Sequence, residues 1–289
     1  MMIVRVLVAL CASALSLAAL TAMGSEPGHS VPEATQESVA YVLWVGANAP
    51  GRADHEEDVI RRALERTVGT HGPFELQVSS DSSLSGRWRQ VLAEGDRIHV
   101  VPTSLMDFPP AELTLIPVPI AGGKLGYRNL IVQKDRLGEF TGVKGVESLS
   151  QFTAAQGRGW PDMWVYEAND LPIVGGYNME HIFQLLAEGA VDYLPLGIEE
   201  TPAILEKYSE LSKDFAIVPE LLVYYPLSSF PVVSNKRPEL IERLRIGLEA
   251  MHADGTLGDT GRSAFKFEKP EKCRVITLEN PSRLFPMLK

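Results

Sequence analysis

The sequence predicts an α/β protein with two lobes, each a mostly parallel sheet flanked by helices, joined by two connecting strands. Short apolar runs typical of buried strands alternate with segments of helical periodicity, as expected for layered α/β structures. The pattern restarts after the glycine-rich segment AGGKLG (121–126), and a second break, YYPLSS, occurs at 224–229. Because these two breaks bracket the central part of the chain, we expect that part to form an inserted second lobe.

Individual elements follow from local patterns. Strands are predicted for the apolar or alternating runs at 41–47, 74–80, 97–103, 113–122, 126–134, 191–196 and 215–227. Helices are predicted where apolar residues recur at helical spacing: after a cap at Asp54, over 83–95, after a cap at Asn178, after Thr201–Pro202, and from Pro238 to near Gly255. The segment 148–157 is compatible with either a helix or a strand.

The first 24 residues are expected to be a cleavable signal peptide. Arg5 precedes an uncharged run over 6–22, and Ala22 and Gly24 are small residues at the −3 and −1 positions of a cut before Ser25. An uncleaved membrane anchor is the alternative interpretation. Residues 25–38 are polar and contain proline, so we expect a flexible leader followed by a mature, periplasmic chain.

Composition and motifs exclude several function classes. The formal net charge of −10 argues against a nucleic-acid partner, since phosphate binding needs clustered cations. Cys11 lies in the predicted signal peptide, so Cys273 has no cysteine with which to pair. The sequence contains no G-x-S-x-G elbow, no phosphate-binding Walker loop and no H-E-x-x-H motif, and its six histidines lack metal-ligand spacing. We therefore predict a protein that is not an enzyme and holds neither a metal nor a cofactor.

Several motifs in order carry a family resemblance: LGYRNLIVQ (125–133), AAQGRGWPD (154–162), FQLLAEGAVDYLPLGIEE (183–200), FPVVSNKRPELIERL (230–244) and DGTL (254–257). On these segments the chain resembles bacterial extracytoplasmic solute-binding proteins of the type II, amino-acid-binding-like branch. More narrowly, it resembles a divergent subgroup described only as transporter substrate-binding-domain proteins. The resemblance implies a type II periplasmic-binding-protein fold that closes like a hinge over a small molecule. The implied first lobe comprises 39–122 and 225–289, and the second comprises 123–224.

The resemblance also implies an anion-binding arginine. In amino-acid-binding members, an arginine and the amides of a helix N-terminus hold the ligand carboxylate, because a guanidinium offers two parallel donors. Arg128 and Arg158 are the candidates here. The alternatives are that Arg128 is a surface strand residue paired with an acid such as Asp135, and that Arg158 is a solvated loop cation.

Further candidates lie in the glycine-rich turn and at strand ends. Gly157 and Gly159 would let the backbone approach a ligand closely, and Trp160 would stack on it, unless that tryptophan is core packing. Asn48, Thr103 and Ser104 follow predicted strands and could hydrogen-bond a polar solute, although such residues are also ordinary turn formers.

One departure from the family pattern concerns the ligand. Amino-acid binders place an acidic residue just after the strand that corresponds to 191–196, and this chain has Leu196 and Gly197 there. Glu199 and Glu200 follow; one of them could reach into the site, or both lie in the first turn of a helix, where acids favourably meet the helix dipole. This departure argues against an α-amino acid ligand.

We therefore predict a monomeric binding protein for a small polar or anionic solute, either amino-acid-like or a carboxylate, which serves a membrane permease or a sensor receptor. One alternative is a docking module for a membrane receptor that has lost ligand binding. Another is a dehydratase-like enzyme for small carboxylates, in which Asp162 or Glu199 acts beside Arg128.

Overall fold

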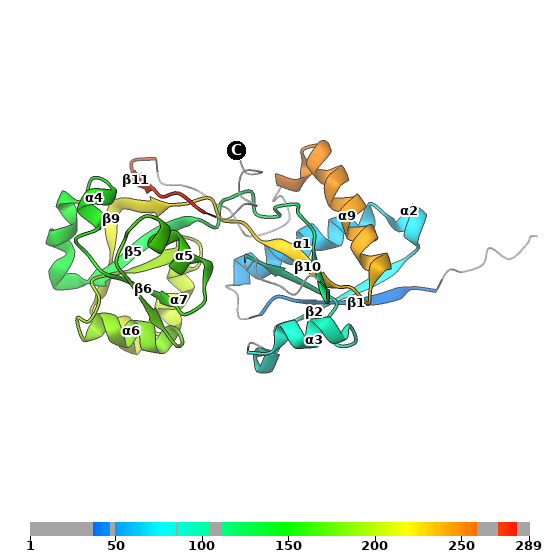
Figure 1. Cartoon of the computed structure of the whole chain (residues 1–289), viewed down its shortest axis with the longest axis horizontal. Helices are drawn as coiled ribbons and strands as arrows, with labels where there is room; N and C mark the ends of the chain where they lie inside the picture. The colour runs from blue at the N-terminus through cyan, green and yellow to red at the C-terminus, as the bar shows by residue number, and fades with distance from the viewer. Residues whose placement is uncertain (1–36, 47–49, 85, 105–110, 259–270, 282–289) are drawn as a thin grey trace, which may run out of the picture. The chain divides into compact units, whose positions relative to one another are not determined.

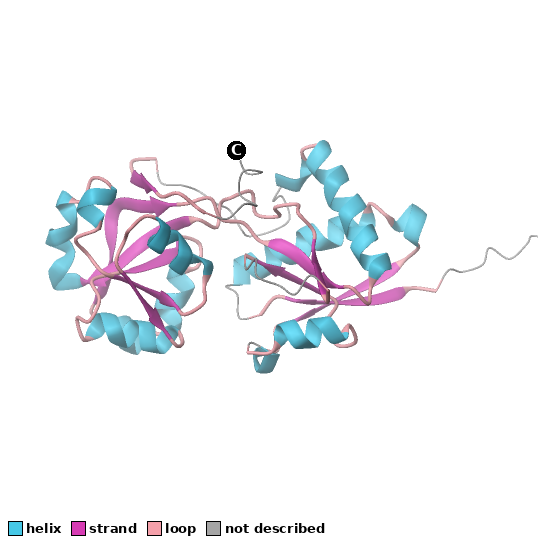
Figure 2. Ribbon diagram, in the orientation of Figure 1, coloured by secondary structure: helices cyan, strands magenta, loops and turns pink. Residues whose placement is uncertain are grey.

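The computed structural model describes residues 37–46, 50–84, 86–104, 111–258 and 271–281. These residues form a mixed α/β structure with sheets of five, four and two strands, flanked by helices (Figure 2). The predicted signal peptide (1–24) lies outside the described residues, as does most of the predicted leader. Within the described ranges, no helix combines the length and the apolar character needed to cross a membrane.

The first sheet has the strand order β2-β1-β3-β10-β4 (Figure 1). Its strands are β1 (Val39–Trp44), β2 (Phe74–Ser79), β3 (Val100–Thr103), β4 (Leu113–Leu115) and β10 (Phe230–Ser234). β1 runs parallel to β2 and β3, whereas β10 is antiparallel to both β3 and β4. The sheet is therefore parallel except for β10, which agrees with the predicted mostly parallel arrangement.

Helices cover both faces of the first sheet because residues of β1 alternate between two cores. Leu43 packs in one core with α1 (Pro50–Glu65) and α9 (Pro238–Ala253), and Trp44 packs in the other with α3 (Trp88–Glu94). Figure 1 shows α3 on the opposite side of the sheet from α9. Shorter elements are α2 (Val68–His71), η1 (Ser82–Leu84) and η3 (Thr256–Gly258).

The start of α1 corrects a sequence-based expectation. The helix already includes Pro50, so Asp54 lies within it and does not cap it. Pro50 is compatible with the first helical turn, because the amide that proline lacks would have no helical partner there.

The second sheet has the order β11-β9-β5-β8 and lies next to a two-stranded β6-β7 ladder. Its strands are β5 (Tyr127–Gln133), β8 (Leu194–Gly197), β9 (Phe215–Tyr224) and β11 (Arg274–Thr277), and the ladder is formed by β6 (Ala154–Gly157) and β7 (Ile173–Gly176). A bridge between Ala154 and Tyr193 joins β6 to the residue just before β8. β5 is antiparallel to both of its neighbours, while β9 and β11 are parallel, as are β6 and β7.

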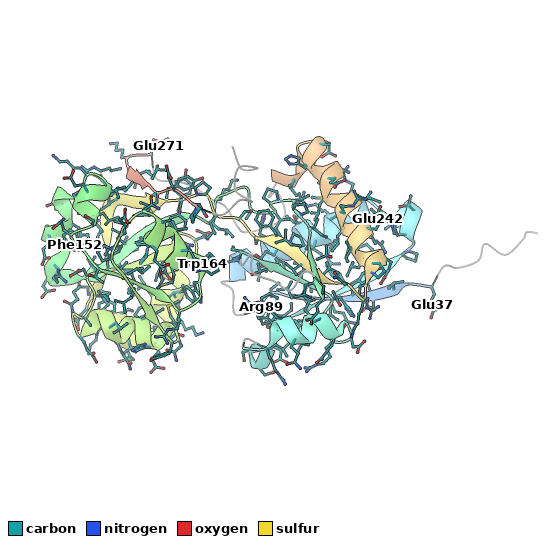
Figure 3. The ribbon with its side chains drawn as sticks, in the orientation of Figure 1. Glu37, Arg89, Phe152, Trp164, Glu242 and Glu271 are labelled. Carbon is teal, nitrogen blue, oxygen red and sulfur yellow. The ribbon has the colours of Figure 1, made fainter. Side chains whose placement is uncertain are left out.

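Alternating residues of β5 divide the surrounding helices between two further cores. Leu130 and Val132 pack in a core that includes Phe140 and Val165, whereas Ile131 packs in the other. Phe152, labelled in Figure 3, stacks on Phe140 with the ring centroids 4.3 Å apart. The helical elements here are η2 (Lys134–Gly142), α4 (Val146–Leu149), α5 (Pro161–Ala168), α6 (Met179–Ala187), α7 (Thr201–Lys207) and α8 (Ser209–Ser212).

Within the described residues, two connecting segments join the first sheet to the second, one between β4 and β5 and the other between β9 and β10. They are hydrogen-bonded to each other, for example from the amide of Ile120 to the carbonyl of Ser229 at 3.0 Å. A side chain at Gly126 would overlap the carbonyl oxygen of Tyr225, so glycine permits the close approach of the two backbones. The segments coincide with the glycine-rich and YYPLSS breaks in the sequence.

The last described strand departs from the predicted lobe boundaries. β11 pairs with β9 in the second sheet, although 225–289 was assigned to the first lobe. The reason is that β9 is a long strand with one edge free of β5, and β11 completes that edge. The division of the chain into two hinged lobes stays a prediction.

We predict that Gly247→Ala destabilises the protein by about 2 kcal/mol or more. A Cβ at Gly247 would overlap the backbone of Ala63, so α1 and α9 would have to separate. The matched control is Gly69→Ala in α2, where nothing lies within 4 Å of the added atom and a stability change of at most about 1 kcal/mol is expected. Urea unfolding measures both, and equal free energies of unfolding for the two variants would contradict the prediction.

Candidate binding site

The turn between β6 and α5 is shaped by two glycines and a tryptophan. Gly159 has a φ of 80°, which side chains rarely adopt. A Cβ at Gly157 would overlap the Trp160 ring, so this ring lies directly on the Gly157 backbone. The Trp160 amide donates to the Gly157 carbonyl at 2.9 Å, and Pro161 begins α5. The glycines are thus required by the turn and by the position of the tryptophan.

At the start of α5, Asp162 forms a buried ion pair with Arg128 of β5. The Arg128 Nη2 atom lies 2.8 Å from the Asp162 Oδ1 atom, and the two side chains are 9% and 5% exposed. Burial alone would lower the pKa of Arg128, but the nearby Asp162, Tyr225 and Glu200 side chains outweigh it and raise the pKa above its ordinary value. The predicted anion-binding arginine therefore already holds a carboxylate of the protein itself.

Tyr225 and Gln156 complete the surroundings of this pair. The Arg128 Nε atom donates to the Tyr225 hydroxyl at 2.8 Å, and that hydroxyl donates to Asp162. Burial holds the pKa of Tyr225 well above its ordinary value, so the hydroxyl stays protonated and available as a donor. The Gln156 amide nitrogen donates to the Pro195 carbonyl and lies 3.4 Å from Asp162. We call Arg128, Gln156, Asp162 and Tyr225 the buried polar cluster.

A second set of charges lies next to this cluster. Arg52 of α1 contacts Glu56 at 3.0 Å and Glu200, just before α7, at 3.4 Å. The site of a Cβ on Gly197 would be 3.1 Å from the Arg128 Nη1 atom and 3.2 Å from the Glu200 Oε2 atom, so both charges flank the end of β8. Glycine at this position leaves room for the two side chains.

Glu199 differs from Glu200 because no cation pairs with it among the described residues. Its Oε2 atom is buried and has no hydrogen-bond partner in the described part of the chain. Burial raises the pKa of Glu199 and the charge of Glu200 adds to the rise, while a hydrogen bond to the residue's own backbone and the charges of Arg128 and Arg52 partly oppose it. The carboxyl group is consequently easier to protonate than an ordinary glutamate.

A separate polar group lies at the end of β3 in the first sheet. Phe230 pairs with Thr103, which places the preceding Ser229 across from Ser104. Ser104 is 8% exposed and Ser229 is fully buried, and the hydroxyls of both lack a hydrogen-bond partner within the described residues. Buried hydroxyls are normally satisfied, and the carboxyl ends of parallel strands are where α/β sheets bind ligands. Two unsatisfied hydroxyls here are available to a polar solute.

The structure separates the predicted site residues into three groups. Arg128 and the turn that carries Gly157, Gly159 and Trp160 come together through Asp162, whereas Thr103 and Ser104 belong to the other sheet. Asn48 lies outside the described residues. Their roles in binding stay predictions.

The structure shows which side chains contact the two candidate arginines, Arg128 and Arg158. Arg128 is neither solvent-exposed nor paired with Asp135, because the pair with Asp162 buries it. Arg158 is exposed and lies over the ring of Tyr177, with its guanidinium carbon 4.5 Å from the centroid. Whether Arg158 binds a ligand or is a solvated loop cation stays a prediction.

Sequence reasoning assigned no site role to several members of the site, among them Gln156 in β6. Tyr225 and Ser229 lie in the YYPLSS break, which indicated a connection and gave no sign of polar side chains directed inward. Glu200 was assigned to a helix dipole, and its contact with Arg52 joins residues far apart in sequence. A periodicity argument cannot find such contacts.

The described residues include no group of three or more histidine, cysteine, aspartate and glutamate side chains placed to hold a metal ion. The arrangement offers hydroxyls at β3 that have no partner within the described residues, the carboxyl groups of Glu199 and Glu200, and the indole of Trp160, which is 37% exposed.

Comparisons of sequence gave no match to any family model or curated protein. Comparisons of structure gave many matches, with low sequence identity. An arginine transport system periplasmic binding protein from Legionella pneumophila has a TM-score of 0.50 and 12% identity, over 76% of this chain and 96% of that one. An ancestral arginine-binding protein bound to arginine has a TM-score of 0.49 and 16% identity, over 75% and 94%. A histidine kinase sensor domain similar to periplasmic binding proteins has a TM-score of 0.46 and 16% identity, over 76% and 93%.

At these identities the likeness concerns the fold. The chain has the α/β fold of the periplasmic binding proteins, and the predicted fold class is confirmed.

We predict strong coupling between Arg128 and Asp162 in stability. Asp162→Ala should lower the free energy of unfolding by about 3 kcal/mol, because it leaves a buried guanidinium without its counter-ion. Adding Arg128→Met should restore part of that loss. The control is Arg245→Met, since exposed ion pairs such as those of Arg245 with Glu242 and Glu249 contribute about 1 kcal/mol or less. A double-mutant cycle by urea unfolding in which the two effects simply add would contradict this coupling.

A pH-dependent effect is predicted for Glu199. Since the folded protein raises its pKa above the usual 4.5, the unfolded chain ionises first, and stability is lost as the pH rises from about 4.5 through the folded pKa. Glu199→Gln should therefore be more stable than the parent protein at pH 7, with the advantage shrinking toward pH 4. Thermal unfolding of ligand-free protein across this range measures the difference, and an advantage independent of pH would refute the assignment.

Proposed function

We propose that this protein binds a small polar solute in the periplasm and delivers it to a membrane permease or reports it to a sensor receptor. The observation that carries the proposal is the fold, which is shared with a periplasmic binding protein of a transport system along nearly the full length of that protein. Binding is expected to involve closure of two lobes at the connecting segments, without chemical conversion of the solute.

Unsatisfied polar groups support a binding role. Buried hydroxyls that lack partners cost stability, and since those of Ser104 and Ser229 have none within the described residues, a ligand is a better explanation for them than folding alone. Their position at the carboxyl end of β3 matches where ligands bind in sheets of this type. The signal-peptide pattern of the first 24 residues supports export and a periplasmic location.

A docking role is the second candidate, and the aromatic surface near α5 favours it. Trp160, Trp164 and Tyr177 are 37%, 44% and 74% exposed, and Trp164 is labelled on α5 in Figure 3. Exposed aromatic side chains next to an arginine such as Arg158 are typical of protein interfaces. In this alternative the protein contacts a membrane receptor through that surface and needs no solute.

A thermal-shift screen of the purified mature chain distinguishes the two roles. The probes are amino acids, dicarboxylates and polyamines, and a bound probe at 100 times its Kd should add about 2.7 kcal/mol of stability. Ser104→Ala and Ser229→Ala should each weaken binding of the strongest probe by up to about tenfold, through loss of one hydrogen bond. Ser82→Ala, at an exposed serine, is the matched control and should leave affinity unchanged.

The outcomes separate the proposals clearly. Stabilisation by a probe that both serine variants retain would remove the β3 hydroxyls from the site. If no probe stabilises the protein while a membrane receptor co-purifies with the parent chain and not with a Trp164→Ala variant, the docking role replaces solute binding.

A further inference from the structure

Arg128 is poorly available to an external anion. Its Nη2 atom contacts Asp162 at 2.8 Å, its Nε atom donates to Tyr225 at 2.8 Å, and its side chain is 9% exposed. A ligand carboxylate held by two parallel donors of this guanidinium would have to displace Asp162 and leave that carboxylate buried without its counter-ion, which is strongly unfavourable. The internal aspartate thus occupies the position where a bound carboxylate would sit.

Around the Arg128–Asp162 pair, carboxyl groups outnumber guanidinium groups. Two guanidiniums, those of Arg52 and Arg128, are surrounded by four carboxyl groups: Glu56, Asp162, Glu199 and Glu200. Arg52 is shared between two of these acids, and Arg128 is engaged by Asp162. Glu199 therefore has no close cation within the described ranges, which leaves an excess of negative charge in a partly desolvated area.

Two observations independent of charge point to a donor-bearing ligand. Gln156 is 2% exposed and lies against Asp162, its amide nitrogen is used by Pro195, and its Oε1 atom has no partner among the described residues. That oxygen can only accept a hydrogen bond, so it requires a donor. The Trp160 indole, two residues before Asp162, is partly exposed, and an indole face attracts organic cations.

We propose that the solute is recognised through an organic cation, an amine or a guanidinium, and that a carboxylate on the solute contributes nothing to its binding. This inference rests on the proposed function as a solute-binding protein and specifies the chemistry of the solute, whose cationic group it places at the acids around Arg128. It reverses the anionic or carboxylate ligand that the sequence analysis favoured.

The test compares three probes in isothermal titration calorimetry on the mature chain. Agmatine is arginine without the carboxylate, L-arginine carries both groups, and glutarate carries carboxylates only. We expect agmatine to bind at least as tightly as arginine. Glutarate should bind at least about a hundredfold more weakly than agmatine, because it lacks the two charge-assisted hydrogen bonds that the cationic group donates.

Variants connect the result to named residues. Glu200→Gln, at a side chain that is 19% exposed, should weaken agmatine about tenfold without unfolding the protein. The matched control is Glu167→Gln, at an exposed acid on α5, for which unchanged affinity is expected. Asp162→Asn should improve arginine relative to agmatine by about tenfold, because it releases Arg128 for the carboxylate; if that variant does not fold, Glu200→Gln decides alone.

Each outcome supports or overturns the inference. Tight binding of glutarate, or arginine binding at least tenfold more tightly than agmatine, overturns the cation assignment while leaving solute binding in place. Unchanged agmatine affinity in Glu200→Gln overturns the role given to these acids. If none of the three probes binds, nor any other amine in the thermal-shift screen, the cation inference fails. The proposed solute-binding function is contradicted as well only if no other probe in the thermal-shift screen stabilises the protein.

Discussion

The buried ion pair between Arg128 and Asp162 is the interaction on which the site depends. It joins the start of β5 to the first turn of α5, and the Tyr225 hydroxyl extends it to the segment that returns toward β10. Removing two charges from water is costly, and the cost is offset here because guanidinium, hydroxyl and carboxylate satisfy one another in a single network. The start of α5 is therefore fixed relative to β5, and so is the turn that precedes this helix.

The glycines of that turn follow from the same constraint. With Asp162 held at the second position of α5, the chain leaving β6 has only a few residues in which to reverse, and Gly159 supplies the left-handed conformation needed. Trp160 then lies flat on Gly157, where any side chain would displace it. An aromatic ring is thereby presented at a defined place beside a carboxylate. The sequence motif AAQGRGWPD is thus explained by backbone geometry as much as by ligand contact.

The sequence patterns predicted the helices and strands better than they predicted the contacts between side chains. Apolar runs and caps correctly indicated β1, β5 and α9, and Asn178 caps α6 as expected by accepting from the His181 amide at 2.8 Å. β7 was missed because half of it is glycine, and β11 because a short strand at a sheet edge carries little periodicity. The partner of Arg128 could not be decided from the sequence, which offered Asp135 in one interpretation and Asp162 in the dehydratase-like alternative. Only the packing of α5 on β5 decides between them.

Which acid pairs with Arg128 determines the charge of the ligand that we expect. An arginine near a connecting segment predicts an anionic solute when its guanidinium is free to bind one. When the guanidinium is already paired with an aspartate of the protein, it no longer favours an anion. In this chain the pair is internal, and the acids nearby outnumber the cations, so electrostatic complementarity favours a positively charged solute.

The absence of an acid at Leu196 and Gly197 is then not a loss of cation recognition. Glu199 and Glu200, a few residues further along the chain, provide carboxylates near the end of the same strand, and Gly197 leaves the space that one of them and Arg128 both use. The proposed preference for an amine thus rests on two local features, the position of these acids a few residues further along the chain and the internal counter-ion of Arg128.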